Sequence, residues 1–386
     1  MDAELKQFDV IIVGGGPAAS VLAWRMPREK QVLIVDRRFL LTPERLYERE
    51  KCCGGMLDET AQKALAKLGI PVPHEVLVGP QVYAIRAIDF GNQMEKYYQK
   101  AYVNIDRAKF DAHLLGLAAK RPNVTVWQGS IAGDIQEEKD SVSVLVRKED
   151  GSKERVSAPY LVGADGGGSM VRSYLAKEWA GTAAEKNAPK VYASIQEWHK
   201  MPKALPYYVS TFNESVTDFY SWIIPEGEYM IIGSAIPQGE NVRQRFNLFK
   251  ADLASKGFDV SKPVKERGAI ILRPKFWGSV QSGRGRIFLV GEAAGLISPS
   301  SSEGISFALR SGEKLAEAFR SKLPIMIRSC YERELLPLKI SIALKSLKSP
   351  IMYGKKLRGL VFKTGALSMK VNKQWVDIRI DPQADP

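Results

Sequence analysis

Two glycine-rich segments lie near opposite ends of this 386-residue chain, and each follows a short apolar run and precedes a helical pattern. In the first, an apolar run at 10–13 ends in three glycines at 14–16, and a helical pattern follows at 17–26. This order predicts a strand, a tight turn and a helix. Such a unit constrains the fold strongly, because its glycines and its helix amino terminus together form a site for a diphosphate.

Four residues of this turn are candidates for contact with a dinucleotide. Gly14 permits the tight turn, and Gly16 lets a pyrophosphate approach the backbone. Pro17 and Ala18 open the helix, so their end of the helix faces the diphosphate. The alternative interpretation is a glycine turn at an unrelated junction between a strand and a helix.

A second apolar run, at 31–35, ends in Asp36 and Arg37, about 20 residues after the glycines. A carboxylate at that position is typical of dinucleotide sites, where it binds ribose hydroxyls. The strand, the helix, the second strand and the terminal acid therefore occur in the order and at the spacing of a dinucleotide-binding unit. This agreement favours a dinucleotide site over an isolated glycine turn.

The distal segment indicates which dinucleotide is bound. It has an apolar run at 287–290, a glycine-rich turn at 291–295 and a helical pattern at 304–318. A second unit of strand, turn and helix suits FAD, whose ribityl chain and pyrophosphate need contacts beyond those of the first unit. The residues of this unit expected at the cofactor are Gly291, Glu292, Gly304 and Ile305.

A third motif, Leu161-Val-Gly-Ala-Asp165-Gly166, stands between the other two. The three motifs, in this order and at this spacing, resemble the flavoprotein hydroxylases and their relatives over roughly the first 320 residues. The resemblance implies that Asp165 and Gly166 lie near the pyrophosphate. It also implies that Glu292, which replaces the usual Asp of that family, lies near the ribityl chain. Arg107 stands where these proteins often carry an arginine close to the flavin, and the alternative is a solvated charge at a helix start.

The motif order predicts an α/β fold whose Rossmann-like FAD-binding domain is discontinuous in sequence. Strand-like alternation between the motifs predicts an inserted, antiparallel-sheet substrate domain that roofs the flavin. A helical carboxyl-terminal region completes the chain. The expected parts are the FAD-binding domain at 1–79, 103–182 and 274–325, the roof at 80–102 and 183–273, and a basic amphipathic region at 326–386.

Composition excludes several classes of protein. The chain is 45% hydrophobic, as expected for a globular enzyme, and no apolar stretch reaches the length of a membrane span. Three cysteines argue against a disulfide framework, and three scattered histidines argue against a metal site. We therefore expect a cytoplasmic protein without a bound metal or a cleavable signal.

Much of the net charge of +13 comes from a segment at 339–373 that contains no Asp or Glu. Its lysines alternate with apolar residues, which is typical of a basic amphipathic region. One interpretation places it on an anionic membrane surface, on the inner face of the membrane. The other packs its apolar face on the flavin domain and leaves the lysines solvated. Nothing in the segment matches a nucleic-acid-binding motif, so we expect no nucleic acid partner.

Two further segments carry a closer resemblance. Lys51-Cys-Cys-Gly-Gly-Met-Leu57 and Tyr220-Ser-Trp-Ile-Ile-Pro225, together with GEAAGLISPSSSEGISFALRSG at 291–312 and Ala193-Ser-Ile-Gln-Glu-Trp198, resemble the geranylgeranyl reductase family of flavoproteins. The resemblance spans nearly the whole chain, and is closest to the bacterial branch that includes the colicin M resistance oxidoreductase.

The resemblance implies an FAD-dependent oxidoreductase that reduces carbon–carbon double bonds of an isoprenoid or similar apolar substrate. It implies that Cys53 and Gly54 lie near the flavin and that the strand with Tyr220 and Trp222 lines a lipid cavity, although aromatics on one face of a strand are more often core. Cys52 stands where proline is common. Candidate proton sources are Cys53, Tyr220 and a water molecule, and NAD(P)H or another electron donor would reduce the flavin.

Two other enzyme classes share the FAD motifs. A flavin monooxygenase needs oxygen to form its product. A flavin-dependent halogenase acting on an aromatic substrate is suggested by the Tyr-x-Trp-x-Ile-Pro pattern, although halogenases have Trp in the first place and no matching active-site lysine can be assigned. A lipid carrier that uses FAD structurally is the non-enzymatic alternative.

Overall fold

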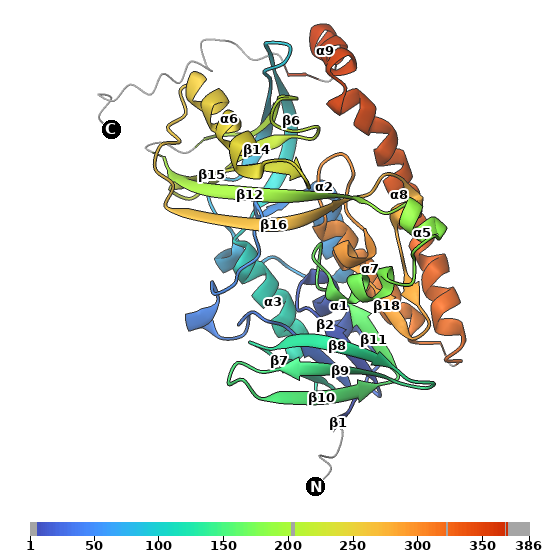
Figure 1. Ribbon diagram of the computed structural model, residues 1–386. Helices are drawn as coiled ribbons and strands as arrows, with labels where there is room; N and C mark the ends of the chain where they lie inside the picture. The colour runs from blue at the N-terminus through green and yellow to red at the C-terminus, as the bar shows by residue number, and fades with distance from the viewer. Residues whose placement is uncertain (1–5, 202–204, 322, 367, 370–386) are drawn as a thin grey trace.

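The computed structural model describes residues 6–201, 205–321, 323–366 and 368–369. Two layers lie one above the other in Figure 1: a lower part built on a six-stranded sheet and an upper part built on an eight-stranded sheet. A long helix, α8 (Met326–Tyr353), runs along the side of both parts. This is the α/β architecture predicted from the motif order.

The six-stranded sheet brings the three glycine motifs together. β11 pairs in parallel with β2 on one side and with β18 on the other, so the turns that follow these strands meet at one edge. β2 and β3 are buried along their whole length, as expected for parallel strands covered on both faces. In spatial order the strands are β17 (Gly283–Arg284), β18 (Ile287–Leu289), β11 (Tyr160–Gly163), β2 (Val10–Val13), β3 (Val32–Val35) and β7 (Val124–Trp127).

The helices that follow these strands pack against one another beside the sheet. α1 (Pro17–Arg25) contacts both α7 (Ile305–Ala318) and α3 (Arg107–Ala119). Nearly every α1 residue from Pro17 to Ala23 is buried, because the helix is covered on both sides. α2 (Glu59–Leu68) packs on α7 and begins at Asp58, whose side chain accepts a hydrogen bond from Ala61 N.

A small four-stranded sheet lies at the amino-terminal end of the lower part (Figure 1). Its order is β1 (Lys6–Gln7), β10 (Lys153–Ala158), β9 (Val142–Arg147) and β8 (Ile131–Glu137). Two short helices, α4 (Met170–Ala176) and α5 (Ala183–Lys186), follow β11 and lead to the upper part. Short 3-10 turns occur at Pro43–Arg45, His74–Val76, Trp277–Ser279 and Gly291–Ala294.

The eight-stranded sheet forms the predicted roof. Its pairings are antiparallel except for one, between β13 and β5, which is parallel. Most of its strands come from 80–102 and 183–273, and the short β4 comes from the Cys-Cys-Gly-Gly segment. The order is β16 (Lys265–Arg273), β12 (Lys190–Lys200), β15 (Tyr229–Pro237), β14 (Ser221–Glu226), β13 (Tyr208–Phe212), β5 (Val82–Asp89), β6 (Met94–Asn104) and β4 (Met56–Leu57).

The two faces of the roof differ in what covers them. On the outer face, α6 (Val242–Ser255) buries Phe246 and Phe249 in one apolar cluster with Ile223 of β14. Trp222 and Ile224, the neighbours of Ile223, belong to a different cluster on the opposite face. This alternation along β14 leaves an aromatic face directed at the glycine turns below.

The crossing of α1 and α7 depends on one glycine. A Cβ atom at Gly312 would lie 2.3 Å from the Ala18 carbonyl oxygen and 3.1 Å from Leu22 N. Both neighbours are backbone atoms of a buried helix, so neither can move cheaply. Glycine is therefore required here despite its poor helix propensity.

We expect Gly312→Ala to lower the free energy of unfolding by about 1–3 kcal/mol, because the added methyl separates the two helices. Gly116→Ala in α3 is the matched control, since no atom lies within 4 Å of the added Cβ. It should be neutral or stabilise the protein by up to about 1 kcal/mol through helix propensity. Urea unfolding of the two variants would test this, and equal midpoints would contradict it.

Candidate active site

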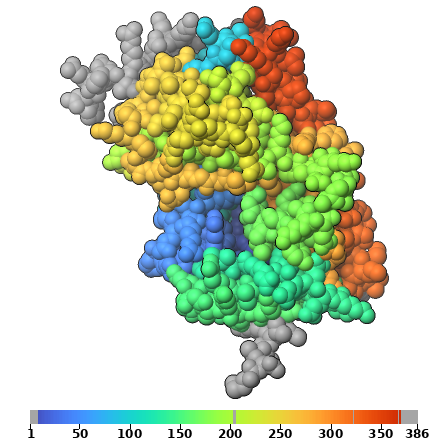
Figure 2. Space-filling model, in the orientation of Figure 1, coloured from blue at the N-terminus to red at the C-terminus, as the bar shows by residue number. Residues whose placement is uncertain are grey.

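One cavity of about 920 Å³ lies between the glycine turns and the roof sheet. Figure 2 shows the surface hollowed between the blue residues near position 50 and the green residues near position 170. Every residue that the sequence predicted for the cofactor or for catalysis lines this cavity: Gly14, Gly16, Pro17, Ala18, Asp36, Arg37, Cys53, Gly54, Arg107, Asp165, Gly166, Tyr220, Trp222, Gly291, Glu292, Gly304 and Ile305.

The first glycine turn presents bare backbone to the cavity. Gly14 has a φ of +101°, and a Cβ there would lie 2.6 Å from the Ala164 carbonyl oxygen, so the turn packs directly on the middle motif. At Gly16, by contrast, the nearest atom to an added Cβ is an Arg38 nitrogen at 3.9 Å. The open space at Gly16 is where a ligand can approach the backbone.

Asp36 is held by the chain itself. Its carboxylate accepts hydrogen bonds from Gly15 N, from Arg38 N at 2.7 Å, and from Arg38 Nε and Nη2 at 3.1 and 2.9 Å. Four bonds match the acceptor capacity of a carboxylate. Any ribose hydroxyl that binds at Asp36 must therefore share or replace one of these donors.

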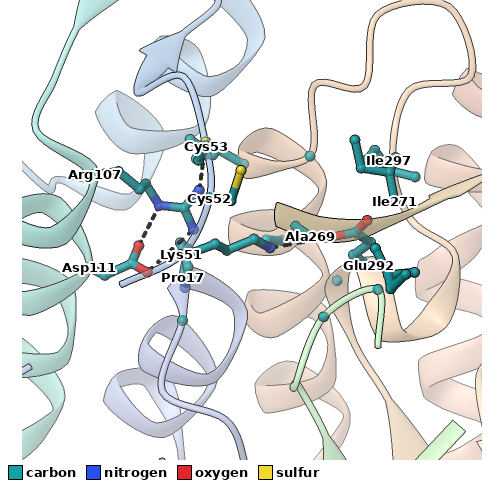
Figure 3. A pocket seen from close by; sticks show the side chains of 18 of the residues that line it. Pro17, Lys51, Cys52, Cys53, Arg107, Asp111, Ala269, Ile271, Glu292 and Ile297 are labelled. Carbon is teal, nitrogen blue, oxygen red and sulfur yellow. Dashed lines mark hydrogen bonds and ion pairs between the residues drawn. The ribbon is translucent and has the colours of Figure 1, made fainter. Parts of the chain in front are cut away.

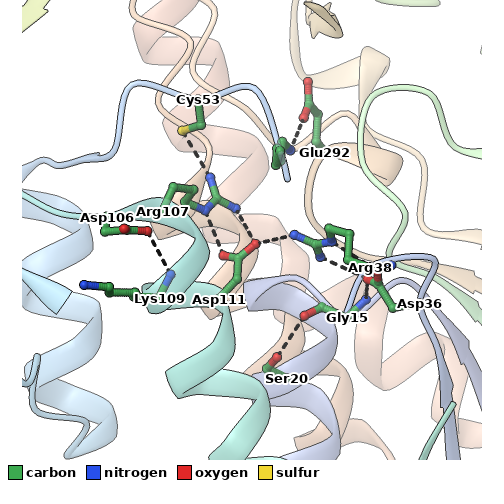
Figure 4. Close-up of polar contacts among 11 residues, drawn as sticks. Gly15, Ser20, Asp36, Arg38, Cys53, Asp106, Arg107, Lys109, Asp111 and Glu292 are labelled. Carbon is green, nitrogen blue, oxygen red and sulfur yellow. Dashed lines mark hydrogen bonds and ion pairs between the residues drawn. The ribbon is translucent and has the colours of Figure 1, made fainter. Parts of the chain in front are cut away.

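The ion pairs continue from Asp36 to the Cys-Cys-Gly-Gly segment (Figure 4). Arg38 Nη1 donates to Asp111 Oδ2 at 2.7 Å, and Arg107 Nε donates to Asp111 Oδ1 at 2.7 Å. Arg107 Nη1 then donates to Cys53 Sγ at 3.2 Å. The Arg107 side chain is only 10% exposed, so it is a buried cavity residue and not a solvated charge at the helix start.

Opposing effects determine the pKa values in this row. Burial alone would raise the pKa of Asp111, but the positive charges of Arg107 and Arg38 outweigh it and lower that pKa. Burial would likewise lower the pKa of Arg38, and the carboxylates of Asp36 and Asp111 raise it instead. Both arginines and Asp111 are therefore charged at neutral pH, and each depends on its partner.

The two neighbouring cysteines have different surroundings. The Cys52 sulfur lies 2.7 Å from Gln196 Oε1 of β12, and burial is the main cause that raises the pKa of this thiol to about 12. Cys52 is therefore a neutral donor that ties its segment to the roof. The Cys53 sulfur lies beside Arg107 and accepts a hydrogen bond from its guanidinium group, as Figure 3 shows.

Glu292 bridges the two parts of the molecule. Its Oε2 atom lies 3.3 Å from Lys51 Nζ (Figure 3). Its Oε1 atom accepts a hydrogen bond from Leu272 N of β16 at 3.2 Å. An aspartate at this turn would be one methylene shorter. The departure from the family pattern thus coincides with a side chain that contacts the roof sheet.

Aromatic side chains form the roof wall. The rings of Tyr220 and Trp222 lie 5.5 Å apart, and Tyr220 OH donates to the Ser301 carbonyl oxygen at 2.7 Å. Trp222 lies over Gly233, where a Cβ would come within 2.5 Å of the indole. Gly54 is equally constrained, because a Cβ there would lie 2.0 Å from Ile224 Cδ1. The segments that carry the family resemblance therefore contact one another directly.

Sequence reasoning missed three charged residues of the site. Arg38 and Asp111 have no motif of their own, although Asp111 stands four residues after Arg107 on the same helix, a spacing that can form an ion pair. Glu303 accepts hydrogen bonds from Lys100 Nζ and Tyr102 OH, both at 3.1 Å. It lines the cavity within the segment at 291–312, which carries the family resemblance but in which the sequence analysis gave Glu303 no role.

Two buried polar atoms in the cavity wall test whether FAD fits. Asp165 Oδ1 and Trp222 Nε1 are buried and have no hydrogen-bond partner among the described residues. Burial raises the pKa of Asp165, so its carboxylate would be stabilised by a donor from a ligand. With the open backbone at Gly16, Asp165 fits a large polar cofactor in the lower half of the cavity, whereas Trp222 Nε1 lies in the roof wall beside Gly233.

Comparison with known proteins identifies the cofactor. The FAD-binding domain family matches residues 7–324, most of the chain. This chain belongs to that family of FAD-binding flavoproteins. It is 34% identical over 361 residues to protein CbrA of Escherichia coli O1:K1, with 94% of each chain covered. The relationship predicted from the motifs is confirmed, and FAD is the cofactor of this flavoprotein.

Solved structures share the fold at lower identity. A geranylgeranyl bacteriochlorophyll reductase-like protein of Thermoplasma acidophilum has a TM-score of 0.75 at 20% identity, covering 94% of this chain and 91% of that one. PqsL of Pseudomonas aeruginosa has a TM-score of 0.63 at 15% identity, covering 93% and 100%. The flavin-dependent brominase Bmp2 has a TM-score of 0.66 at 17% identity, covering 93% of each chain.

None of the helices in the described part of the chain combines the length and the apolar character needed to cross a membrane. No group of three or more His, Cys, Asp or Glu side chains among the described residues could hold a metal ion.

We expect Arg38→Met to lower the free energy of unfolding by about 3 kcal/mol at pH 7, because it leaves Asp36 and Asp111 buried with too few partners. The lowered pKa of Asp111 means that its ion pairs stabilise the fold fully above about pH 4 and lose that effect as the pH falls through the lowered pKa. The difference between variant and parent should therefore shrink below about pH 4. Urea unfolding at several pH values measures it, and a constant difference would contradict this account.

We expect Asp165→Ala to weaken FAD binding by roughly tenfold or more, because the cavity loses a buried acceptor. Quenching of FAD fluorescence on titration with apoprotein measures the affinity. Asp140→Ala is the control, since Asp140 is 77% exposed and, in the part of the chain that the structure describes, pairs only with Arg286. Equal affinities of the two variants would remove Asp165 from the site.

Proposed function

We propose that this flavoprotein reduces carbon–carbon double bonds of an isoprenoid or similar apolar lipid. The observation that carries the proposal is the aromatic face formed by Trp222 of β14 and by Tyr220, which directly precedes this strand; this face closes the cavity opposite the glycine turns. Such a wall favours an apolar substrate that is held by burial, with few polar contacts. Bound FAD supplies the hydride after reduction by NAD(P)H or another electron donor, and a proton from the protein or from water completes the saturated product.

The residues of the chain orient the substrate and hold the proton. Tyr220 is fixed by its hydrogen bond to Ser301 O, and burial is the main cause that raises its pKa, so the phenol keeps its proton at neutral pH. The Cys53 sulfur is fixed by Arg107 Nη1 at 3.2 Å. Cys53, Tyr220 and an ordered water are the candidate proton sources.

Monooxygenase or halogenase activity on an aromatic substrate is the second candidate. It is supported by the similarity to PqsL and to the brominase Bmp2, with TM-scores of 0.63 and 0.66. The Tyr220-Ser-Trp222-Ile-Ile-Pro225 pattern supports the same class. A halogenase has an active-site lysine, and no residue was assigned to that role from the sequence. Lys51 lines the cavity, and it pairs with Glu292.

Anaerobic turnover distinguishes these activities. With chemically reduced enzyme and an unsaturated isoprenoid, we expect a product heavier by two hydrogens under strict exclusion of oxygen, measured by mass spectrometry. A product that forms only with oxygen and carries an oxygen atom, or one that needs a halide, would instead establish the second candidate.

We expect Cys53→Ala to lower the rate of double-bond reduction by about 100-fold, because general acid catalysis by a positioned group typically contributes at least this much. FAD content should stay unchanged. Cys330→Ala on α8 is the matched control and should keep the parental rate, since Cys330 does not line the cavity. A parental rate in the Cys53 variant would leave Tyr220 and water as the proton sources.

A further inference from the structure

α8 has two apolar faces, and only one of them packs on the protein. The packed face buries side chains spaced three or four residues apart, with exposed fractions between 0% and 4%. These residues are Ile327, Tyr331, Leu335, Leu338 and Ile342. This face accounts for the predicted alternative in which the amphipathic segment packs on the flavin domain.

The second face is an apolar stripe that points to solvent. It consists of Leu336, Ile340, Leu344, Leu347 and Ile351, with exposed fractions between 44% and 67%. At about 100° of rotation per residue, the stripe lies roughly opposite the packed face. Folding alone does not explain five large apolar side chains in a row on the surface, and such a row marks an interaction site.

Unpaired lysines border the apolar stripe. Lys339 and Lys348 lie along its two edges at helical spacing, and α9 (Lys355–Thr364) continues the basic surface. Among the described residues, none of the carboxylates forms an ion pair with Lys339, Lys348, Lys355, Lys356 or Lys363. Because no Asp or Glu occurs at 335–376, nothing nearby in sequence neutralises this charge.

α9 repeats the same combination on a smaller scale. Leu357 and Leu360 are 48% and 60% exposed. A hollow of about 590 Å³ beside this helix is lined by Lys356 and Lys363 together with the turn at 91–94. In Figure 1, α9 continues from the end of α8 along the same edge of the molecule.

We propose that α8 and α9 dock on an anionic membrane surface. The apolar stripe enters the boundary between headgroups and acyl chains, and the bordering lysines contact anionic headgroups. Charge complementarity selects this occupant, because a neutral protein partner would leave the unpaired lysines without counter-charges.

The docked helix also contacts the elements that form the cavity wall. At its end, Tyr353 OH donates to the Ser300 carbonyl oxygen at 2.5 Å, on the loop that lines the cavity. The Tyr353 ring stacks on Tyr220 at 6.4 Å and contacts Phe219 at 4.9 Å. A lipid substrate that leaves the membrane would thus first meet the helix whose inner side contacts the aromatic wall. This substrate route rests on the proposed function.

Sedimentation with vesicles tests the docking. The full-length holoprotein should bind phosphatidylcholine vesicles that contain phosphatidylglycerol, and should bind pure phosphatidylcholine weakly. Leu344→Glu combined with Leu347→Glu should weaken binding at least roughly tenfold, because two buried leucines are lost. Leu248→Glu on α6 is the matched control, since Leu248 is 46% exposed on the helix that covers the outer face of the roof sheet, and it should bind as the parent does.

The electrostatic part has its own variants. Lys348→Ala and Lys356→Ala should each weaken binding roughly fivefold, and added salt should weaken binding of the parent. Lys153→Ala on β10, an exposed lysine in the lower part, should have no effect. Equal binding of the stripe variant and the parent would overturn the proposal, as would no binding at low salt.

Two further measurements separate the alternatives. If the stripe variant turns a dimer into a monomer in analytical ultracentrifugation while the parent ignores vesicles, the surface is a protein interface and the membrane proposal fails. If the parent binds vesicles but reduces no isoprenoid, in vesicles or in detergent, the proposed function fails and the docking stands. We expect the stripe variant to reduce a detergent-dispersed isoprenoid at the parental rate and a vesicle-embedded one at least roughly tenfold more slowly.

Discussion

The parallel pairing of β2, β11 and β18 is the constraint on which the rest of this protein depends. Only when these strands lie side by side do the three glycine turns meet at one edge of the sheet. Parallel neighbours need long crossover connections, so the chain must leave the sheet and return between them. The roof sheet is built largely from what lies within those connections, and this is why it covers the site that the turns create.

The parts of this arrangement that could be predicted have strong local signals. Glycines followed by a helical pattern identify a dinucleotide turn because few other residues permit the close backbone approach. The alternation at 191–198, 207–212, 219–224 and 229–236 predicted four strands, which the structure has at nearly the same bounds. The family resemblance added Cys53 and Gly54, whose closeness to β14 no periodicity would reveal.

What could not be predicted depends on contacts between distant segments. Arg38 follows the expected Asp36 by two residues, but only the fold brings it to Asp111, 73 positions away. α6 was not predicted, although Phe246, Phe249 and Leu253 have helical spacing, and only the fold shows that this helix covers the outer face of the roof. The amphipathic segment near the carboxyl terminus was recognised, yet its apolar residues divide between a packed and an exposed face, and parts of it, including Leu367 and Lys373, lie outside the described residues.

The contact between Gly54 and Ile224 has an evolutionary consequence. A side chain at position 54 would occupy the space that the tip of Ile224 already fills, so the two positions share one fixed volume. A larger residue at position 54 can fit only if the residue at position 224 becomes smaller by a similar volume. Relatives that accommodate wider or narrower substrates are therefore expected to change both positions together. The two residues jointly determine the distance between the cofactor-binding half and its roof.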